Sequence, residues 1–243
     1  ALRGGHRAEI EGMGGKSGVP QPRCLELFDE GSLAMIRPEA GSLNVPAAAR
    51  AAIYFEEECE PESLDERLES WLALIEACQG LADDTIVVTN DAQESELKRL
   101  RHALPSLMNE RGRAARAFGG MKLGTDWAVP LESVGPMIEE ATRLANEVFG
   151  GFYIRYGHLG NGHPHFNLLA KDAAELTKAR KAIHAMCLHA VSLGGTVTAE
   201  HGVGKLKREY VGLQYPGWVI DAMRSVKRAL DPAGILAPGN IFE

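Results

Sequence analysis

Histidine is concentrated in one short stretch, YGHLGNGHPHFN, which spans residues 156–167. His158, His163 and His165 all lie in it, in a chain that has 8 histidines in total. Histidine is the commonest metal ligand among protein side chains, because a neutral imidazole offers a nitrogen lone pair. The clustering therefore suggests a metal site. The plain alternative is a group of solvated residues beside a turn.

The Asn-Gly pair at the centre of the stretch predicts how these side chains are arranged. Asn-Gly between two strand-like runs is the strongest short signal for a two-residue β-hairpin loop. Counting outward from such a loop, His158 faces His165, and Tyr156 faces Asn167. Directly opposed residues have Cβ atoms about 4.5–5.5 Å apart, close enough for two imidazoles to share one ion. We expect His163 to fall on the opposite face, outside this pair.

A site with two histidines needs an oxygen ligand, and TAEHGVGK at 198–205 offers one. Glu200 lies beside His201 in a glycine-flanked segment that follows an apolar helix pattern. Two histidines and a carboxylate with an open coordination position are typical of catalytic rather than structural sites. The predicted ion is Zn²⁺, with Mn²⁺ or Fe²⁺ as alternatives. Taken alone, a Glu-His pair is also compatible with an ordinary surface pair.

Composition limits the classes of protein. Hydrophobic residues make up 45% of the 243 residues, charged residues 24%, and the net charge is −7, which are ordinary values for a globular chain. A mildly acidic chain is a poor candidate for non-specific nucleic-acid binding, which needs clustered Lys and Arg. No run of about 18 apolar residues is present to span a membrane. The 4 cysteines are scattered without CxxC spacing, which favours reduced thiols in a cytoplasmic setting.

Strand and helix patterns interleave along the chain. This favours an α+β fold, in which helices pack on one face of a mainly antiparallel sheet. Residues 1–24 lack periodicity and are predicted to be a tail or linker, followed by one domain over 25–243. Strands are predicted at 51–58, 85–90, 151–158 and 164–170, and helices at 61–80, 97–108, 134–148, 172–193 and near 215–230.

Two local signals concern helix ends. Ser63 and Glu66 have the S-x-x-E spacing of a capping box at the start of the helix predicted over 61–80. Pro105 falls within the next helix pattern. It is expected to kink that helix or end it early, since proline lacks an N–H and clashes with the preceding turn.

Five segments together resemble a known family. The chain is similar to the C-terminal domain of FAD-linked oxidases of the D-2-hydroxy-acid dehydrogenase type, which act on D-lactate, glycolate or D-2-hydroxyglutarate. The similarity runs from about residue 25 to the end and implies a ferredoxin-like cap domain. The segments that carry it are LELFDEGSLAMI (25–36), MKLGTDWAVP (121–130), YGHLGNGHPHFN (156–167), TAEHGVGKLK (198–207) and ALDPAGILAPGNIF (229–242).

The resemblance implies roles for matched positions. His158, His165 and Glu200 match metal ligands, and His201 matches the base that takes the hydroxyl proton of the substrate. Hydride would pass from the same carbon to FAD. The matched substrate-binding positions are Arg101, Lys122 and Asn167, and those near the flavin are Tyr156, Gly239 and Asn240.

The resemblance also implies partners. The FAD-binding domain of the family precedes this region, so we expect this chain to depend on one in the same or a partner chain. Relatives often have Asp in place of Asn161 and Asn in place of His163. The form found here resembles a subgroup fused to iron–sulfur modules, so an iron–sulfur module or a quinone is the expected electron acceptor. The setting would then be cytoplasmic or peripheral at the inner membrane.

Two other functions remain open from the sequence. The same two histidines and glutamate could activate water in a stand-alone metallohydrolase, which would need no flavin. A non-catalytic binding domain of the same fold would bind no metal and would gain no activity beside a flavin domain.

Overall fold

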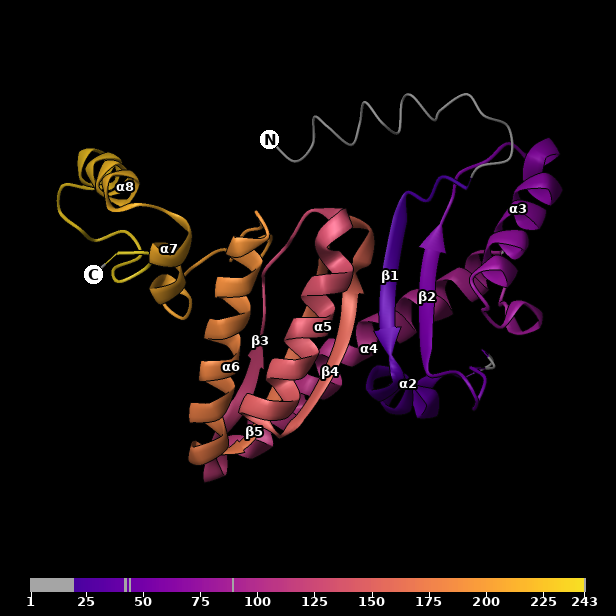
Figure 1. The fold of residues 1–243 in the computed structure, drawn as a ribbon, viewed down its shortest axis with the longest axis horizontal. Helices are drawn as coiled ribbons and strands as arrows, with labels where there is room; N and C mark the ends of the chain where they lie inside the picture. The colour runs from indigo at the N-terminus through magenta and orange to yellow at the C-terminus, as the bar shows by residue number, and fades with distance from the viewer. Residues whose placement is uncertain (1–19, 42, 44, 89, 243) are drawn as a thin grey trace. The chain divides into compact units, whose positions relative to one another are not determined.

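The computed structural model describes residues 20–41, 43, 45–88 and 90–242, and its internal contacts divide the chain into two compact units, Ala1–Leu107 and Met108–Glu243 (Figure 1). Most of the predicted tail over 1–24 lies outside the described residues, and Cys24 already begins a strand. Among the described residues, none of the helices combines the length and the apolar character that crossing a bilayer requires.

The first unit contains a two-stranded antiparallel ladder with helices beside it. Strand β1 pairs with β2 from Cys24 opposite Glu56 to Asp29 opposite Ala51. Asp29 also caps the helix that follows, because its carboxylate accepts a hydrogen bond from the backbone N–H of Ser32. The elements that begin in this unit are β1 (Cys24–Asp29), α2 (Glu30–Ile36), β2 (Ala51–Glu56), α3 (Leu64–Ala77) and α4 (Asp91–Ala115).

Helix α3 forms where the apolar pattern predicts it, but the predicted capping box is wrong. The Ser63 hydroxyl donates to the carbonyl of Glu60, 2.9 Å away, and makes no cap hydrogen bond to the helix. A 3₁₀ turn over Pro61–Ser63 precedes α3 and takes up the residues that the capping box would have used. The local backbone turn therefore outcompetes the S-x-x-E arrangement.

The predicted strand at 85–90 is also wrong. Residues 85–88 form no strand, and residue 89 lies outside the described residues. Ile86 and Val87 are 42% and 44% exposed, although both have high β-propensity. A strand persists only when a neighbour satisfies its backbone hydrogen bonds, and this segment makes no ladder within the described part of the chain.

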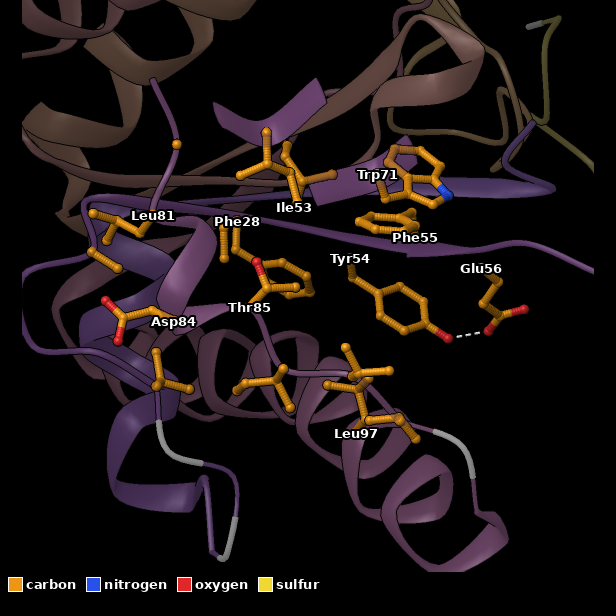
Figure 2. A pocket seen from close by; sticks show the side chains of 18 of the residues that line it. Phe28, Ile53, Tyr54, Phe55, Glu56, Trp71, Leu81, Asp84, Thr85 and Leu97 are labelled. Atoms are coloured by element: carbon orange, nitrogen blue, oxygen red, sulfur yellow. Dashed lines mark hydrogen bonds between the residues drawn. The ribbon is translucent and has the colours of Figure 1, made fainter. Parts of the chain in front are cut away.

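The segment instead lines a cavity of about 970 Å³ in the first unit (Figure 2). Phe55 stacks on Trp71 with ring centroids 3.7 Å apart. The Tyr54 hydroxyl donates to Glu56 just below this pair in the view, and burial raises the pKa of that phenol. The cavity walls are mainly aromatic and aliphatic, and its lining residues all belong to the first unit.

Helix α4 continues through Pro105 to Ala115, so of the two predicted effects of the proline, an early end is wrong and a kink stays a prediction. Leu100, Leu104 and Met108 recur at helical spacing and are 4%, 0% and 0% exposed. Burial of three such side chains stabilises by roughly 1.5–3 kcal/mol each, which outweighs the cost of about 3 kcal/mol for an interior proline.

The second unit contains a three-stranded antiparallel arrangement in which β5 lies between β4 and β3. Helices α5 and α6 pack against each other, and α6 crosses β5 and β3 on one face, where Met137, Phe166 and Met186 are fully buried. The α+β prediction is confirmed. The elements are β3 (Gly119–Gly124), α5 (Val134–Leu144), β4 (Phe152–His158), β5 (His163–Asp172), α6 (Ala173–Ser192), α7 (Arg208–Gln214) and α8 (Gly217–Leu230).

Candidate functional site

The histidine-rich stretch forms the β4–β5 hairpin, but with a longer loop than the sequence predicts. Residues 159–162 connect the strands, and the directly opposed pairs are His158 with His163 and Tyr156 with His165. The predicted pairs of His158 with His165 and Tyr156 with Asn167 are therefore wrong, and Asn167 lies opposite Ile154.

A contact with a distant segment sets this loop. Leu159–Asn161 form a 3₁₀ turn, and Gly162 ends it in the left-handed region with φ 68°. The carbonyl of Gly162 accepts a hydrogen bond from the Val129 N–H at 3.0 Å. A Cβ at position 162 would lie 2.0 Å from the Val129 carbonyl oxygen, so only glycine fits this close approach.

His163 lies on the same face as the other two histidines, so its predicted placement on the opposite face is wrong. Residues two apart along a strand point to the same side, which puts His163 with His165 and Asn167. The ring of His163 lies 5.8 Å from that of His158 and 4.4 Å from that of His165, measured between centroids. This is the face turned away from the apolar core that contains Phe166.

Glu200 is brought to the hairpin by a segment that runs beside residues 126–128. This segment, residues 196–200, is called the strap. Ala128 and Thr196 form an isolated antiparallel bridge, with backbone hydrogen bonds of 3.1 and 2.8 Å. Ala199 N–H then donates to the Asp126 carbonyl at 2.8 Å. These bonds hold the backbone of residues 196–199 and so bring Glu200 over the histidine face.

Two histidines and the glutamate converge on one point. Nε2 of His158 lies 3.2 Å from Oε2 of Glu200, and Nε2 of His165 lies 3.1 Å from Oε1. One ligand atom from each of the three residues lies within 4.8 Å of the others, a spacing compatible with one shared ion. The three residues predicted as metal ligands are thus brought together. Their role as ligands stays a prediction.

His201 lies at the same place, between two carboxylates. Its Nδ1 is 3.1 Å from Oδ1 of Asp126, and its Nε2 is 3.2 Å from Oε1 of Glu200. The side chain is 55% exposed, so the imidazole is accessible to a small molecule. A carboxylate on Nδ1 fixes the orientation of the ring and leaves Nε2 directed towards the site.

Asp126 is a central residue that the sequence analysis did not identify. Its side chain is fully buried, and it accepts hydrogen bonds from Lys207 at 2.7 Å and from the Thr198 hydroxyl at 2.9 Å. The backbone N–H groups of Glu200 and His201 donate to it at 3.3 Å. A buried acid in the otherwise apolar DWAV stretch was the available signal, because a buried carboxylate requires partners.

The electrostatic environment keeps the acids charged and one imidazole neutral. Burial opposes ionisation of Asp126, yet contacts with His163, Lys207 and Thr198 hold its pKa well below the usual range. Burial also opposes ionisation of Glu200, but the surrounding histidines lower its pKa overall. Burial and, second to it, the charge interaction with the neighbouring His163 lower the pKa of His165 to about 4. A neutral imidazole beside an ionised carboxylate is the protonation state that binds a metal.

Two residues predicted to bind substrate share the histidine face. Lys122 of β3 lies opposite Leu169, and Gly124 lies opposite Asn167, so both predicted side chains belong to this side of the sheet. Burial lowers the pKa of Lys122, and no carboxylate is paired with it among the described residues. Its Cβ is close to the backbone of Gly112 in α4, where an added Cβ would approach to 2.7 Å.

Tyr156, predicted to lie near the flavin, is also on this face. Its ring meets that of His165 edge-on, with centroids 5.9 Å apart. Burial raises the pKa of its hydroxyl to about 12, and a hydrogen bond with Asn167 opposes that shift. The phenol is therefore neutral at physiological pH.

The remaining predicted residues have local partners of their own. Arg101 belongs to the first unit, where its guanidinium pairs with Glu26 at 2.6 Å. Gly239 has φ 78°, and its position lies beside Lys205 in the segment that follows the Glu-His pair. The N–H of Asn240 bonds the carbonyl of Ala237 in a terminal turn.

Comparison of the sequence with known proteins identifies a matching family and several relatives. A sequence model of the family described as "FAD linked oxidases, C-terminal domain" matches residues 16–241. Glycolate oxidase subunit GlcD of Bacillus subtilis (strain 168) is 29% identical over 226 residues, which cover 91% of this chain and 45% of that relative. D-2-hydroxyglutarate dehydrogenase of Xanthomonas citri pv. viticola is 29% identical over 179 residues, 71% of this chain and 36% of that relative.

Among solved structures, 4-ethylphenol oxidase from Gulosibacter chungangensis in an isoeugenol complex aligns with a TM-score of 0.48 at 14% identity. The alignment covers 90% of this chain and 47% of that chain. The chain thus spans less than half the length of the relatives compared with it.

Proposed function

This chain belongs to the family of FAD-linked oxidase C-terminal domains, and we propose that it is the substrate- and metal-binding part of a flavin-dependent D-2-hydroxy-acid dehydrogenase. The reaction would convert a substrate of the lactate, glycolate or 2-hydroxyglutarate class to the 2-oxo acid. The observation that carries this proposal is the convergence of His158, His165 and Glu200 on one point, with His201 beside it.

The donor set fits a divalent transition metal. It combines two imidazole nitrogens with a carboxylate, which suits Zn²⁺, Mn²⁺ or Fe²⁺ better than Mg²⁺ or Ca²⁺. The lowered pKa of His165 leaves its lone pair available at neutral pH. An ion held here by His158, His165 and Glu200 would supply Lewis-acid stabilisation of the deprotonated substrate hydroxyl.

His201 is the proposed base. Its Nδ1–H donates to Asp126, so Nε2 is the nitrogen that can take the hydroxyl proton. The ionised carboxylate then stabilises the imidazolium that forms. Asp126 itself is held by Lys207 and Thr198, and it therefore acts as a positioning residue for His201.

Two side chains on the histidine face suit the carboxylate of the substrate, Lys122 by its charge and Asn167 by its hydrogen-bonding amide. Lys122 carries an ammonium with no carboxylate partner among the described residues, and a substrate anion would supply one. Asn167 lies on the same face of β5, two residues from the strand partner of Lys122, and carries an amide. Arg101 is part of the proposal as a second cation, although Glu26 already occupies its guanidinium.

Bound FAD would supply the hydride acceptor, and the family relationship implies a separate FAD-binding domain that holds most of the cofactor. From this chain, Tyr156, Gly239 and Asn240 are proposed to contact it. Tyr156 fits this role because its neutral, half-buried ring borders His165. An iron–sulfur module or a quinone is the proposed onward electron acceptor, in the cytoplasm or at the inner membrane.

The test combines metal analysis with reconstitution. The purified chain should contain about one divalent ion, and His165→Ala should lose most of it. Together with the FAD-binding domain, the chain should reduce a dye with D-lactate, glycolate or D-2-hydroxyglutarate, and His201→Gln should lower kcat by about 10²–10⁴-fold. Chelator-sensitive hydrolysis of esters or amides by the chain alone would instead indicate a metallohydrolase.

A further inference from the structure

His163 borders the proposed cation site without any role assigned to it. Its side chain is only 4% exposed, and Nδ1 lies 2.5 Å from the Trp127 carbonyl oxygen. A carbonyl can only accept, so Nδ1 donates this hydrogen bond, and in the neutral imidazole Nε2 carries a free lone pair. Among the described residues, this buried Nε2 has no hydrogen-bond partner.

The lone pair is directed at other electron-rich atoms. Nε2 of His163 lies 3.4 Å from Oδ1 of Asp126 and 3.6 Å from Oε1 of Glu200. An ionised carboxylate has only acceptor oxygens, so neither group offers a proton to this nitrogen. Three acceptor atoms facing one another in a buried place repel, unless a positive charge lies between them, either a proton on Nε2 or a metal ion.

The ring geometry fits a shared ion. With metal–nitrogen distances near 2.1 Å and about 1.1 Å from nitrogen to ring centre, rings on one ion have centroids about 4.5–5.5 Å apart for coordination angles of about 90–120°. The three centroid distances among His158, His163 and His165 are 5.8, 5.3 and 4.4 Å. Each therefore lies within about 0.3 Å of that range.

We propose that Nε2 of His163 is a further ligand of the cation, which is then held by three imidazoles and one carboxylate. This rests on the cation site of the proposed function and adds a ligand to it. The Nε2 atoms of His158, His163 and His165 all lie within 3.6 Å of a Glu200 carboxylate oxygen. Among the described residues, only His158, His165 and Glu200 have ligand atoms within 4.8 Å of one another, so Nε2 of His163 would move towards the ion on binding. Four protein ligands also require a five- or six-coordinate ion if substrate oxygens are to bind.

X-ray absorption on the full chain loaded with Zn²⁺ tests the ligand count directly. The proposal expects three imidazoles around the ion in the wild type and two in His163→Asn. It also expects the variant to bind Zn²⁺ more than about 10-fold more weakly in competition with a chelator. Because the wild-type count needs no substitution, a variant that fails to fold does not weaken the test.

The matched control is His184→Asn, the same change at an exposed histidine of α6. It should leave both the Zn²⁺ affinity and the imidazole count unchanged. A wild-type site with only two imidazoles would overturn the assignment of His163 and leave the proposed function intact. A wild-type chain that binds no Zn²⁺ would overturn the cation site, and His163 with it.

Discussion

Replacing Asp126 with Asn should destabilise the second unit more than any exposed Asp→Asn change. The carboxylate is fully buried and pairs with Lys207, whose side chain is only 20% exposed. It also accepts from Thr198 and from two backbone N–H groups of the strap that carries Glu200. Asn has the same shape but keeps one acceptor oxygen, and it turns an NH₂ group towards these donors.

The size of the effect follows from these contacts. Removing one partner of a buried ion pair costs about 3–5 kcal/mol, because the other charge is left buried and uncompensated. Asn retains part of the hydrogen bonding, and Lys207 keeps some access to water, so we expect the lower end, about 3 kcal/mol. For a chain of this length, that corresponds to a fall in Tm of about 6–12 °C.

Urea unfolding followed by circular dichroism measures the change in the free energy of unfolding. The matched control is Asp221→Asn, which removes the charge from an exposed ion pair with Arg224, 3.0 Å long on α8. That change should cost less than about 1 kcal/mol. A double-mutant cycle of Asp126→Asn with Lys207→Met should show coupling above about 1 kcal/mol, since the two groups contact directly.

The reasoning would be refuted if Asp126→Asn and Asp221→Asn lowered the free energy of unfolding equally. Additive effects of Asp126→Asn and Lys207→Met would show that the ion pair does not hold the strap. Either result would remove the physical basis for calling Asp126 the residue that positions His201.

Three further outcomes can be checked on the same protein. Gly162→Ala should destabilise by more than about 1 kcal/mol in thermal unfolding beyond Gly194→Ala, since both have positive φ but only position 162 places the new Cβ 2.0 Å from a carbonyl oxygen. Lys122→Met should unfold at a higher urea concentration than the wild type at pH 7, and it should bind the hydroxy acid more weakly. Because burial lowers the pKa of Lys122 in the folded state, the stability of the wild type should rise relative to the variant as the pH approaches 10.5. A difference in stability that does not change with pH would contradict this. Cys187, which is buried with its thiol pKa raised to about 12, should react with a disulfide reagent only after unfolding, whereas the exposed Cys59 should react at once.

The sequence alone determined which residue types could form the site and the order of most elements. The types and spacing of His158, His165 and Glu200 were sufficient to propose a metal, whereas the resemblance to a family was needed to propose His201 as a base. Periodicity located the longer helices α3, α4, α5, α6 and α8, because a regular apolar stripe reflects one buried face, whichever element covers it. The short helices α2 and α7 and the strands β1 and β3 were not predicted. Even the placement of His163 follows from strand alternation, once the period of two is applied along β5.

Tertiary contacts decided the register of the hairpin, the burial of Asp126 and the absence of a strand at Ile86–Val87. The loop at residues 159–162 takes its length from the Gly162 contact with Val129, a residue more than thirty positions away, and that contact sets which side chains face each other. The burial of Asp126 depends on a strap that comes from another part of the chain. The Ile86–Val87 segment has strand propensity but no neighbouring strand in the described residues. A sequence states what each residue can bind, while only the fold supplies the partner that it does bind.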